Sequence, residues 1–214
     1  MGTRYLLYRV GYLVQIKLGL LQLKIPHKTF SVSSFRHDLN LGFKPTIAFD
    51  EISDTPFISD TSQSILNGEI KFFNSTWFRI NDDYDWRTNL ETGFRYPLKH
   101  WSKINDFDKE AGDIKYVWEP SRFSWALELV RLDKHEGTNH SEFIFSRMDS
   151  WIESNPVNLG PNYKCSQEMS LRIWNWAILL DFYASSESLS AQRLKAYRES
   201  ISGHLDHIFK NISF

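Results

Sequence analysis

The chain has 214 residues, a formal net charge of −1 and one cysteine, Cys165. This length suits a domain with a substantial core, and the balanced charge gives no strong overall field that would attract nucleic acid or a membrane. A single cysteine excludes an intramolecular disulfide and a multi-cysteine metal site, so we interpret Cys165 as a passive residue at a helix start. Aromatic residues make up 15% of the chain, enough to leave some rings free to stack on sugars.

The first expected element is an amphipathic helix over residues 5–24, which ends before Pro26. Polar residues interrupt its apolar positions, and no small-residue cleavage site follows, so the sequence predicts neither a transmembrane segment nor a clear signal peptide. The helix would pack on the main domain or, through its basic residues, bind a membrane surface or a partner. These basic residues are Arg4, Arg9, Lys17 and Lys24.

We divide the chain into this N-terminal helix (1–26), an extended connection (27–64) and a main domain (65–214). The connection is rich in Ser, Thr, Asp and Pro and has only short apolar pairs. At the start of the main domain, residues 70–73 and 77–80 are β-like. Turn signals such as Asn67-Gly68 flank them.

The rest of the main domain is expected to be helical. One helix starts near Pro120, which suits a first-turn position, and stops at Gly137. The next starts at Asn139 and ends before Asn155-Pro156. Two more helices follow, over about residues 166–183 and 189–210. Helices of this length with short connections fit an array of α-hairpins.

The helix from Ser166 carries a narrow polar stripe. At 3.6 residues per turn, Glu168, Arg172 and Asn175 share one edge, with large apolar residues on both sides. Such a stripe is typical of a helix that is buried on its flanks and turns its polar edge toward a cleft. The alternative is that Glu168 and Arg172 form an ordinary ion pair four residues apart.

A second segment, Trp118-Glu-Pro-Ser-Arg122, repeats the combination of aromatic ring, carboxylate and guanidinium. Guanidinium groups bind carboxylates or sulfates through two hydrogen bonds, and flat rings stack on sugars, so this combination suits an acidic sugar.

Three motifs resemble the N-terminal domain of heparinase II/III-like polysaccharide lyases, the family of heparin-sulfate and alginate lyases. They are residues 112–123 (GDIKYVWEPSRF), 151–156 (WIESNP) and 166–176 (SQEMSLRIWNW), in the family's order. The resemblance implies a mainly α fold, an incomplete α/α toroid preceded by a short β-like segment and the N-terminal helix. It also implies a wall of a cleft for acidic polysaccharide. The residues expected to bind substrate are Trp118, Glu119, Arg122, Tyr163, Glu168, Arg172 and Asn175.

The family cleaves uronic-acid-containing polysaccharides by β-elimination, with an Asn, a Tyr and a His that lie further along the chain. The sequence stops at Phe214, before the expected place of these residues. We therefore expect a truncated lyase that lacks its C-terminal catalytic and β-sandwich portion and is inactive alone. Tyr163 stands where the family commonly has Trp. Such lyases are commonly periplasmic, although this chain shows no clear export signal. The alternative is a non-catalytic module for carbohydrate binding or assembly.

Two other chemistries are weaker alternatives. Glu119, Glu168 or Asp113 could supply the carboxylate pair of a glycoside hydrolase. The arginines near Glu119 and Glu168 favour the ionised carboxylate, however, whereas a general acid needs the protonated form. His204 and His207 have a spacing seen in metal sites, but no further ligands are evident. We therefore expect no metal and no cofactor.

Overall fold

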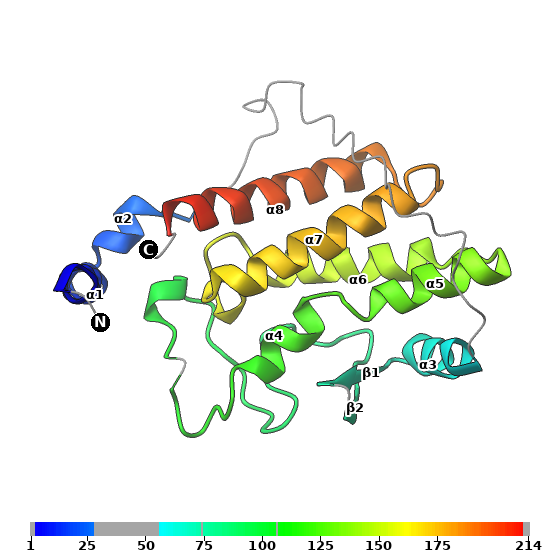
Figure 1. Cartoon of the computed structure of the whole chain (residues 1–214), viewed down its shortest axis with the longest axis horizontal. Coiled ribbons are helices and arrows are strands. Elements are labelled where there is room, and N and C mark those ends of the chain that lie inside the picture. The colour runs from blue at the N-terminus through cyan, green and yellow to red at the C-terminus, as the bar shows by residue number, and fades with distance from the viewer. Residues whose placement is uncertain (1–2, 28–55, 74, 106, 212–214) are drawn as a thin grey trace.

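The computed structural model describes residues 3–27, 56–73, 75–105 and 107–211, and this part of the chain is mainly helical, as predicted (Figure 1). Four helices run side by side through the second half of the chain. Helix α7 packs against α5 and α8, and α6 packs against α8. These helices are α5 (Ala126–Glu136), α6 (Ser141–Ser154), α7 (Ser166–Phe182) and α8 (Ala191–Lys210).

Large aromatic side chains fill the space between these helices. Trp151 of α6 and Trp176 of α7 meet edge to face with ring centroids 5.4 Å apart, and both are fully buried. Tyr197 of α8 and Phe145 of α6 close the same core. Edge-to-face pairs of this kind add about 0.5–1.5 kcal/mol beyond the burial of their surface. The tryptophan excess is therefore partly explained by the core.

Two helix ends follow from the local sequence. Gly137 ends α5 in the left-handed conformation, with φ of 68°, as the glycine stop signal predicts. Ser190 caps α8, because its side chain accepts a hydrogen bond from the backbone N–H of Arg193. Cys165 precedes the first residue of α7, at the helix start where we expected it.

The expected helix from Pro120 to Gly137 is divided into two. Helix α4 (Lys115–Ser121) begins before Pro120, and the chain then breaks before α5. Phe123 has a φ of 61° and a fully buried ring. This ring stacks on Trp86 at 5.4 Å and meets the edge of Trp176 at 5.6 Å. Packing of one phenylalanine therefore stabilises a backbone turn that the helical pattern does not predict.

The β-like segment forms two strands, as expected, and they pair as an antiparallel hairpin. Strands β1 (Glu69–Phe72) and β2 (Thr76–Arg79) pair with Ile70 opposite Phe78. Ile70 and Phe72 point into the core, whereas most of β2 is solvent-exposed.

The predicted extended connection is wrong where it can be compared with the structure. Residues 56–64 belong to helix α3 (Pro56–Leu66), and residues 28–55 lie outside the described part of the chain. Helix α3 packs on α5: Ile65 is buried, and the Ser62 hydroxyl donates to the carbonyl of Glu128 at 3.4 Å. This tertiary contact stabilises a helix in a stretch whose composition suggests a loop.

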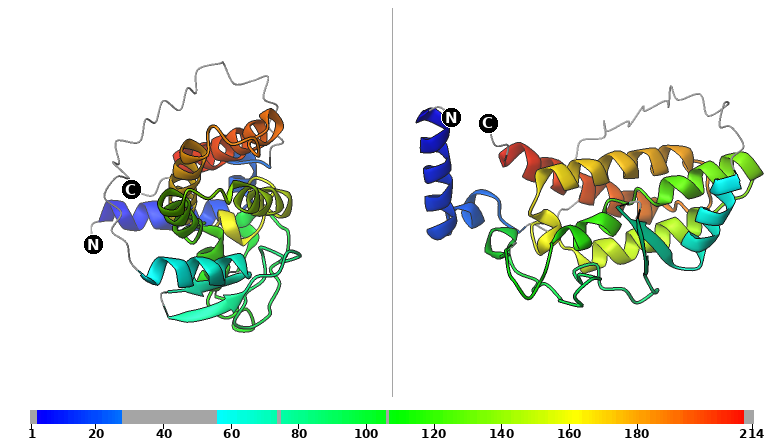
Figure 2. Two further views of the ribbon diagram at one scale, coloured as in Figure 1. Left: turned by 90° about the vertical axis from the view of Figure 1, so that its right-hand side faces the viewer. Right: turned by 60° about the horizontal axis from the view of Figure 1, so that its bottom comes forward.

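The N-terminal helix is also divided. Helix α1 (Thr3–Lys17) and helix α2 (Leu20–Lys24) are separated at Gly19, which has a φ of 72°. Helix α1 stands across one end of the helical body (Figure 2). Leu21 and Ile25 are buried, and the Asn158 side chain donates to the Pro26 carbonyl at 2.8 Å. No helix in the described ranges is long and apolar enough to cross a membrane.

Candidate functional site

The two arginine-containing motifs meet at Arg122. Its Nε donates to Glu168 Oε2 at 2.5 Å and its Nη2 donates to Glu168 Oε1 at 2.8 Å. Its Nη1 also donates to Glu119. Arg122 follows α4, and Glu168 lies in the first turn of α7, so the guanidinium connects segments 46 residues apart. The hydrogen bond to Glu168 raises the pKa of Arg122 and keeps it cationic.

This pairing changes the chemistry expected of Arg122. Its guanidinium already holds two protein carboxylates: Glu168 in the two-bond geometry that we expected for a sugar carboxylate, and Glu119 through one hydrogen bond. Glu168 is also nearly buried, with 5% of its surface exposed. The arrangement stabilises the contact between α4 and α7, and a ligand would have to displace one of the two carboxylates.

Arg172 lies in the interior. Its exposed fraction is 0%, and its guanidinium carbon is 4.2 Å from the centroid of the Trp151 ring. Nε donates to the Ser121 carbonyl at 2.6 Å, and Nη1 is 2.8 Å from His204 Nε2. No carboxylate in the described residues forms an ion pair with Arg172, and burial lowers its pKa to about 10.

His204 is a neutral hydrogen-bond acceptor for the Arg172 cation. Burial, together with the nearby charge of Arg172, holds the pKa of His204 well below its usual range, so the ring is neutral. His204 Nδ1 is 2.6 Å from the Ser200 carbonyl. The tautomer protonated on Nδ1 therefore donates to Ser200 and accepts from Arg172, which satisfies both contacts.

The remaining three predicted site residues also make contacts within the protein. Asn175 Nδ2 donates to the Arg122 carbonyl at 2.8 Å, and Trp118 Nε1 donates to the Pro161 carbonyl at 3.0 Å. Tyr163 is fully buried, and its ring centroid lies 4.9 Å from that of His204. Burial raises the pKa of Tyr163, which opposes its use as a base.

The structure thus brings the two polar motifs together but does not turn the stripe of α7 toward a cleft. Glu168, Arg172 and Asn175 face α4, α8 and the Arg122 turn, and all three are buried. Trp174, from the flank that we expected to be buried, is instead 61% exposed. The alternative of an ion pair four residues apart does not describe the stripe either, because Glu168 pairs with Arg122.

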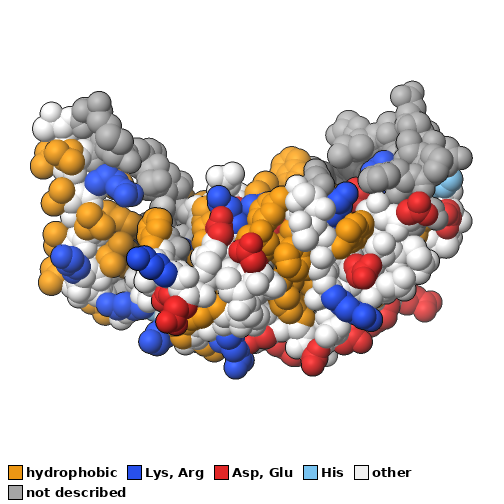
Figure 3. Space-filling model, turned by 90° about the horizontal axis from the view of Figure 1, so that it is seen from below, with side chains coloured by type: hydrophobic (Ala, Val, Ile, Leu, Met, Phe, Trp, Pro, Cys, Tyr) orange, Lys and Arg blue, Asp and Glu red, His pale blue; other side chains and the backbone are white. Residues whose placement is uncertain are grey.

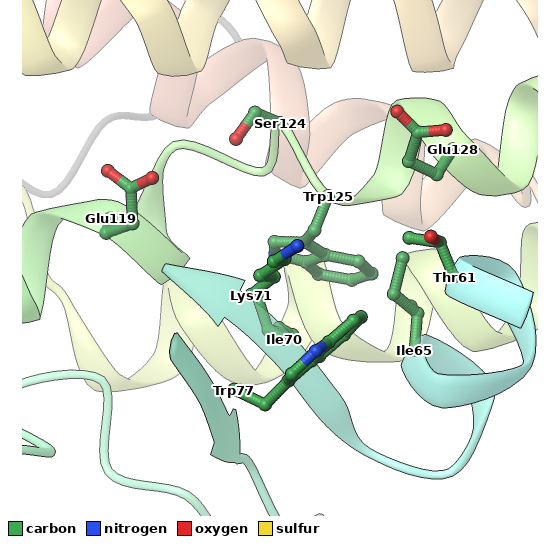
Figure 4. Close-up of a pocket in the computed structure, with 9 residues that line it drawn as sticks. All are labelled: Thr61, Ile65, Ile70, Lys71, Trp77, Glu119, Ser124, Trp125 and Glu128. Atoms are coloured by element: carbon green, nitrogen blue, oxygen red, sulfur yellow. The ribbon is translucent and has the colours of Figure 1, made fainter. Parts of the chain in front are cut away.

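A pocket of about 430 Å³ lies beside this network, between α3, the β-hairpin and α5 (Figure 4). Trp77 of β2 and Trp125 line it, together with Lys71 of β1, and Glu119 and Glu128 lie at opposite ends (Figure 4). Its other lining residues are Thr61, Ile65, Ile70 and Ser124. Of the seven predicted substrate-binding residues, Glu119 lines this pocket, and the other six do not. We call it the Trp77–Trp125 pocket.

The pocket combines apolar rings with a few charged groups, as small-molecule sites commonly do. Trp77 is 39% exposed, and Lys71 Nζ lies 5.7 Å from the centroid of its ring. Glu128 forms an ion pair with Arg131 at 2.8 Å, and Glu119 forms one with Arg122. Neither arginine lines the pocket, so Lys71 is the basic side chain among the lining residues. The β-like patterns around Lys71 and Trp77 were visible in the sequence, but their approach to α5 depends on α3, which was not predicted.

The pocket and its surroundings give no sign of a metal centre. In the described ranges, no group of three or more His, Cys, Asp and Glu side chains could hold a metal ion. His207, the partner of His204 in the sequence motif, is buried, with its Nδ1 2.7 Å from Asn158 Oδ1. The two histidines therefore serve as buried hydrogen-bonding groups.

Comparison of the chain with protein-family models, with curated proteins and with solved structures gives no match.

Proposed function

We propose that the chain binds polysaccharide in the Trp77–Trp125 pocket and forms one wall of the substrate cleft of a heparinase II/III-like lyase. The observation that carries this proposal is the composition of the pocket: two tryptophan rings, two carboxylates and one lysine around a space of about 430 Å³. Aromatic faces bind the apolar faces of sugar rings, and carboxylates accept hydrogen bonds from sugar hydroxyls.

The packing of the helices supports the α/α toroid that this proposal requires. In the described chain, α5 contacts α7 and α6 contacts α8, so helices two apart in sequence are neighbours. Alternating helices pack in this way when hairpins build two layers. The contact between α7 and α8, which follow each other directly, fits the hairpin itself.

In this proposal, Lys71 and not the arginines recognises the carboxylate of an acidic sugar. Arg122 is occupied by Glu119 and Glu168, and Arg172 is buried. A uronate carboxylate beside Lys71 would gain a charge-assisted hydrogen bond of about 1.5–3 kcal/mol. Glu119 and Glu128 would repel a second carboxylate, which favours one uronate flanked by less charged units.

A non-catalytic carbohydrate-binding or assembly module would use the same pocket. The two proposals differ in activity only when the catalytic Asn, Tyr and His of the family are supplied by a longer chain. The 214-residue chain should bind without eliminating, because abstraction of a proton from carbon is slow without a placed base. Ultraviolet absorbance of the unsaturated uronate product tests this with heparan sulfate, hyaluronan and alginate.

Calorimetric titration with uronate oligosaccharides tests the pocket. Trp77→Ala should weaken binding about tenfold, on the scale of one lost ring contact. Lys71→Gln should weaken binding of uronate oligomers by about tenfold or more and leave uncharged analogues little affected. Trp174→Ala is the matched control, because this exposed tryptophan lies outside the pocket. Unchanged binding by Trp77→Ala, or equal loss in Trp174→Ala, would refute the proposal.

A further inference from the structure

Helix α1 turns a row of apolar side chains toward solvent. At 3.6 residues per turn, these side chains fall within an arc of about 120°. Leu7 is 69% exposed and Leu6 is 63% exposed, unusual values for leucines that follow each other in a helix. A lone exposed leucine is ordinary, whereas a contiguous apolar face marks a binding surface. The face consists of Leu6, Leu7, Val10, Leu13 and Val14, and we call it the α1 apolar face.

The α1 apolar face is not the side of the helix that holds it to the protein. Tyr12 and Ile16 pack against the main core, and the Tyr12 hydroxyl donates to Asn211 Oδ1 at 3.2 Å. Tyr8 stacks on Tyr12 with ring centroids 6.2 Å apart. The helix is thus anchored by its tyrosine side, and its leucine side remains exposed.

The charged side chains of the N-terminal segment all have one sign. Residues 1–27 contain Arg4, Arg9, Lys17 and Lys24 and no acidic residue, so all 26 Asp and Glu residues of the chain lie further on. On the helix, Arg4 and Arg9 border the apolar arc on opposite sides. Figure 3 shows hydrophobic and basic side chains together at the end of the molecule that α1 forms.

We propose that α1 lies in the interface of an anionic lipid bilayer, with its apolar face among the acyl chains and its arginines at the headgroups. An apolar face bordered by cations is the pattern of helices that lie on such membranes, because long basic side chains reach up to the headgroups. A second copy of the chain would bring arginines against arginines across this face. The charge therefore selects a negatively charged occupant, and a lipid surface suits a convex helix without a groove.

The test is cosedimentation of the full chain with vesicles, either of phosphatidylcholine alone or of phosphatidylcholine with one third phosphatidylserine. The chain should bind the anionic vesicles and dissociate as salt is raised, because each basic residue near such a surface contributes about a fivefold gain in affinity. Leu6→Gln/Leu13→Gln should reduce binding at least tenfold. Arg4→Gln/Arg9→Gln should remove the preference for phosphatidylserine. Both variants change exposed side chains, and circular dichroism checks that the fold is retained.

Leu171→Gln/Leu205→Gln is the matched control, because these leucines are also exposed but belong to α7 and α8 and not to the α1 apolar face. It should bind vesicles as the parent does. Three results would each overturn the proposal: no binding to anionic vesicles, equal binding to both compositions, or equal loss in the control. Sedimentation velocity without lipid can give a fourth result of this kind. A dimer that Leu6→Gln/Leu13→Gln abolishes would show that the α1 apolar face binds a second copy of the chain.

Discussion

Replacing Arg172 tests whether this arginine supports the fold or binds a ligand. Its guanidinium donates to the Ser121 carbonyl at 2.6 Å, contacts His204 Nε2 at 2.8 Å and lies 4.2 Å from the Trp151 ring centroid. Because Arg172 is fully buried, Arg172→Met should lower the free energy of unfolding and leave sugar binding in the Trp77–Trp125 pocket unchanged.

The expected decrease in the free energy of unfolding is the balance of favourable contacts and the cost of burying a charge. Two hydrogen bonds to a charged donor are worth about 1.5–3 kcal/mol each, and a desolvated cation–π contact about 2 kcal/mol. Against this, burial lowers the pKa of Arg172 from 12.5 to about 10, which corresponds to a penalty of about 3 kcal/mol for the buried charge. The methionine removes both the favourable contacts and the desolvation penalty, so we expect the free energy of unfolding to fall by about 3 kcal/mol. Arg172→Ala should lose more, because it also leaves a cavity.

Urea unfolding of the parent and both variants measures this difference. The parent slope with urea should be retained in Arg172→Met, so that the shift in midpoint reports stability alone. A loss below about 1 kcal/mol would contradict the reasoning, because the hydrogen bonds would then only offset desolvation. A variant with parental stability and weakened sugar binding would instead return Arg172 to the ligand site.

Further predictions concern other residues that stabilise the fold. Burial lowers the pKa of His207 to about 4, so an unfolded chain binds a proton that the native chain excludes between about pH 6.5 and pH 4. Stability should fall by up to about 3 kcal/mol as the pH is lowered through this window, and urea unfolding of His207→Gln should show a flatter dependence. Arg122→Met should lose about 3–5 kcal/mol in the same assay, because it leaves Glu168 buried and unpaired; a further Glu168→Gln change should recover part of that loss. Gly137→Ala places a side chain on the left-handed residue that ends α5, so it should lower the free energy of unfolding by about 1 kcal/mol and lower the melting temperature.

Much of the fold could be predicted from local signals. The strands near Ile70 and Trp77, the glycine stop at Gly137 and the two last helices all follow from short-range patterns, and the structure contains them. The break at Phe123 could not be predicted, since it depends on rings of Trp86 and Trp176 that are distant in sequence. Helix α3 was missed for the same reason, as its burial depends on α5.

The polar stripe shows why the site was harder to predict than the fold. A helical wheel correctly groups Glu168, Arg172 and Asn175, but it cannot distinguish a cleft from a neighbouring helix as the environment of that edge. Helix α8 illustrates the same ambiguity. Leu205 continues the four-residue spacing of the buried Tyr197 and Ile201, yet it is 46% exposed, and His204 is buried. His204 accepts a hydrogen bond from Arg172, which stabilises the histidine in this buried position.

The buried network and the proposed sugar pocket share one residue. Glu119 lines the Trp77–Trp125 pocket, receives a hydrogen bond from Arg122 and accepts another from the backbone N–H of Phe73 at 3.3 Å. The carboxylate is therefore held from two sides, by the turn after α4 and by the end of β1, the strand that carries Lys71. Fixing a polar group before a ligand arrives reduces the entropy lost on binding. We therefore propose that the arginine motif contributes to sugar recognition without lining the pocket itself, because it positions the Glu119 carboxylate there.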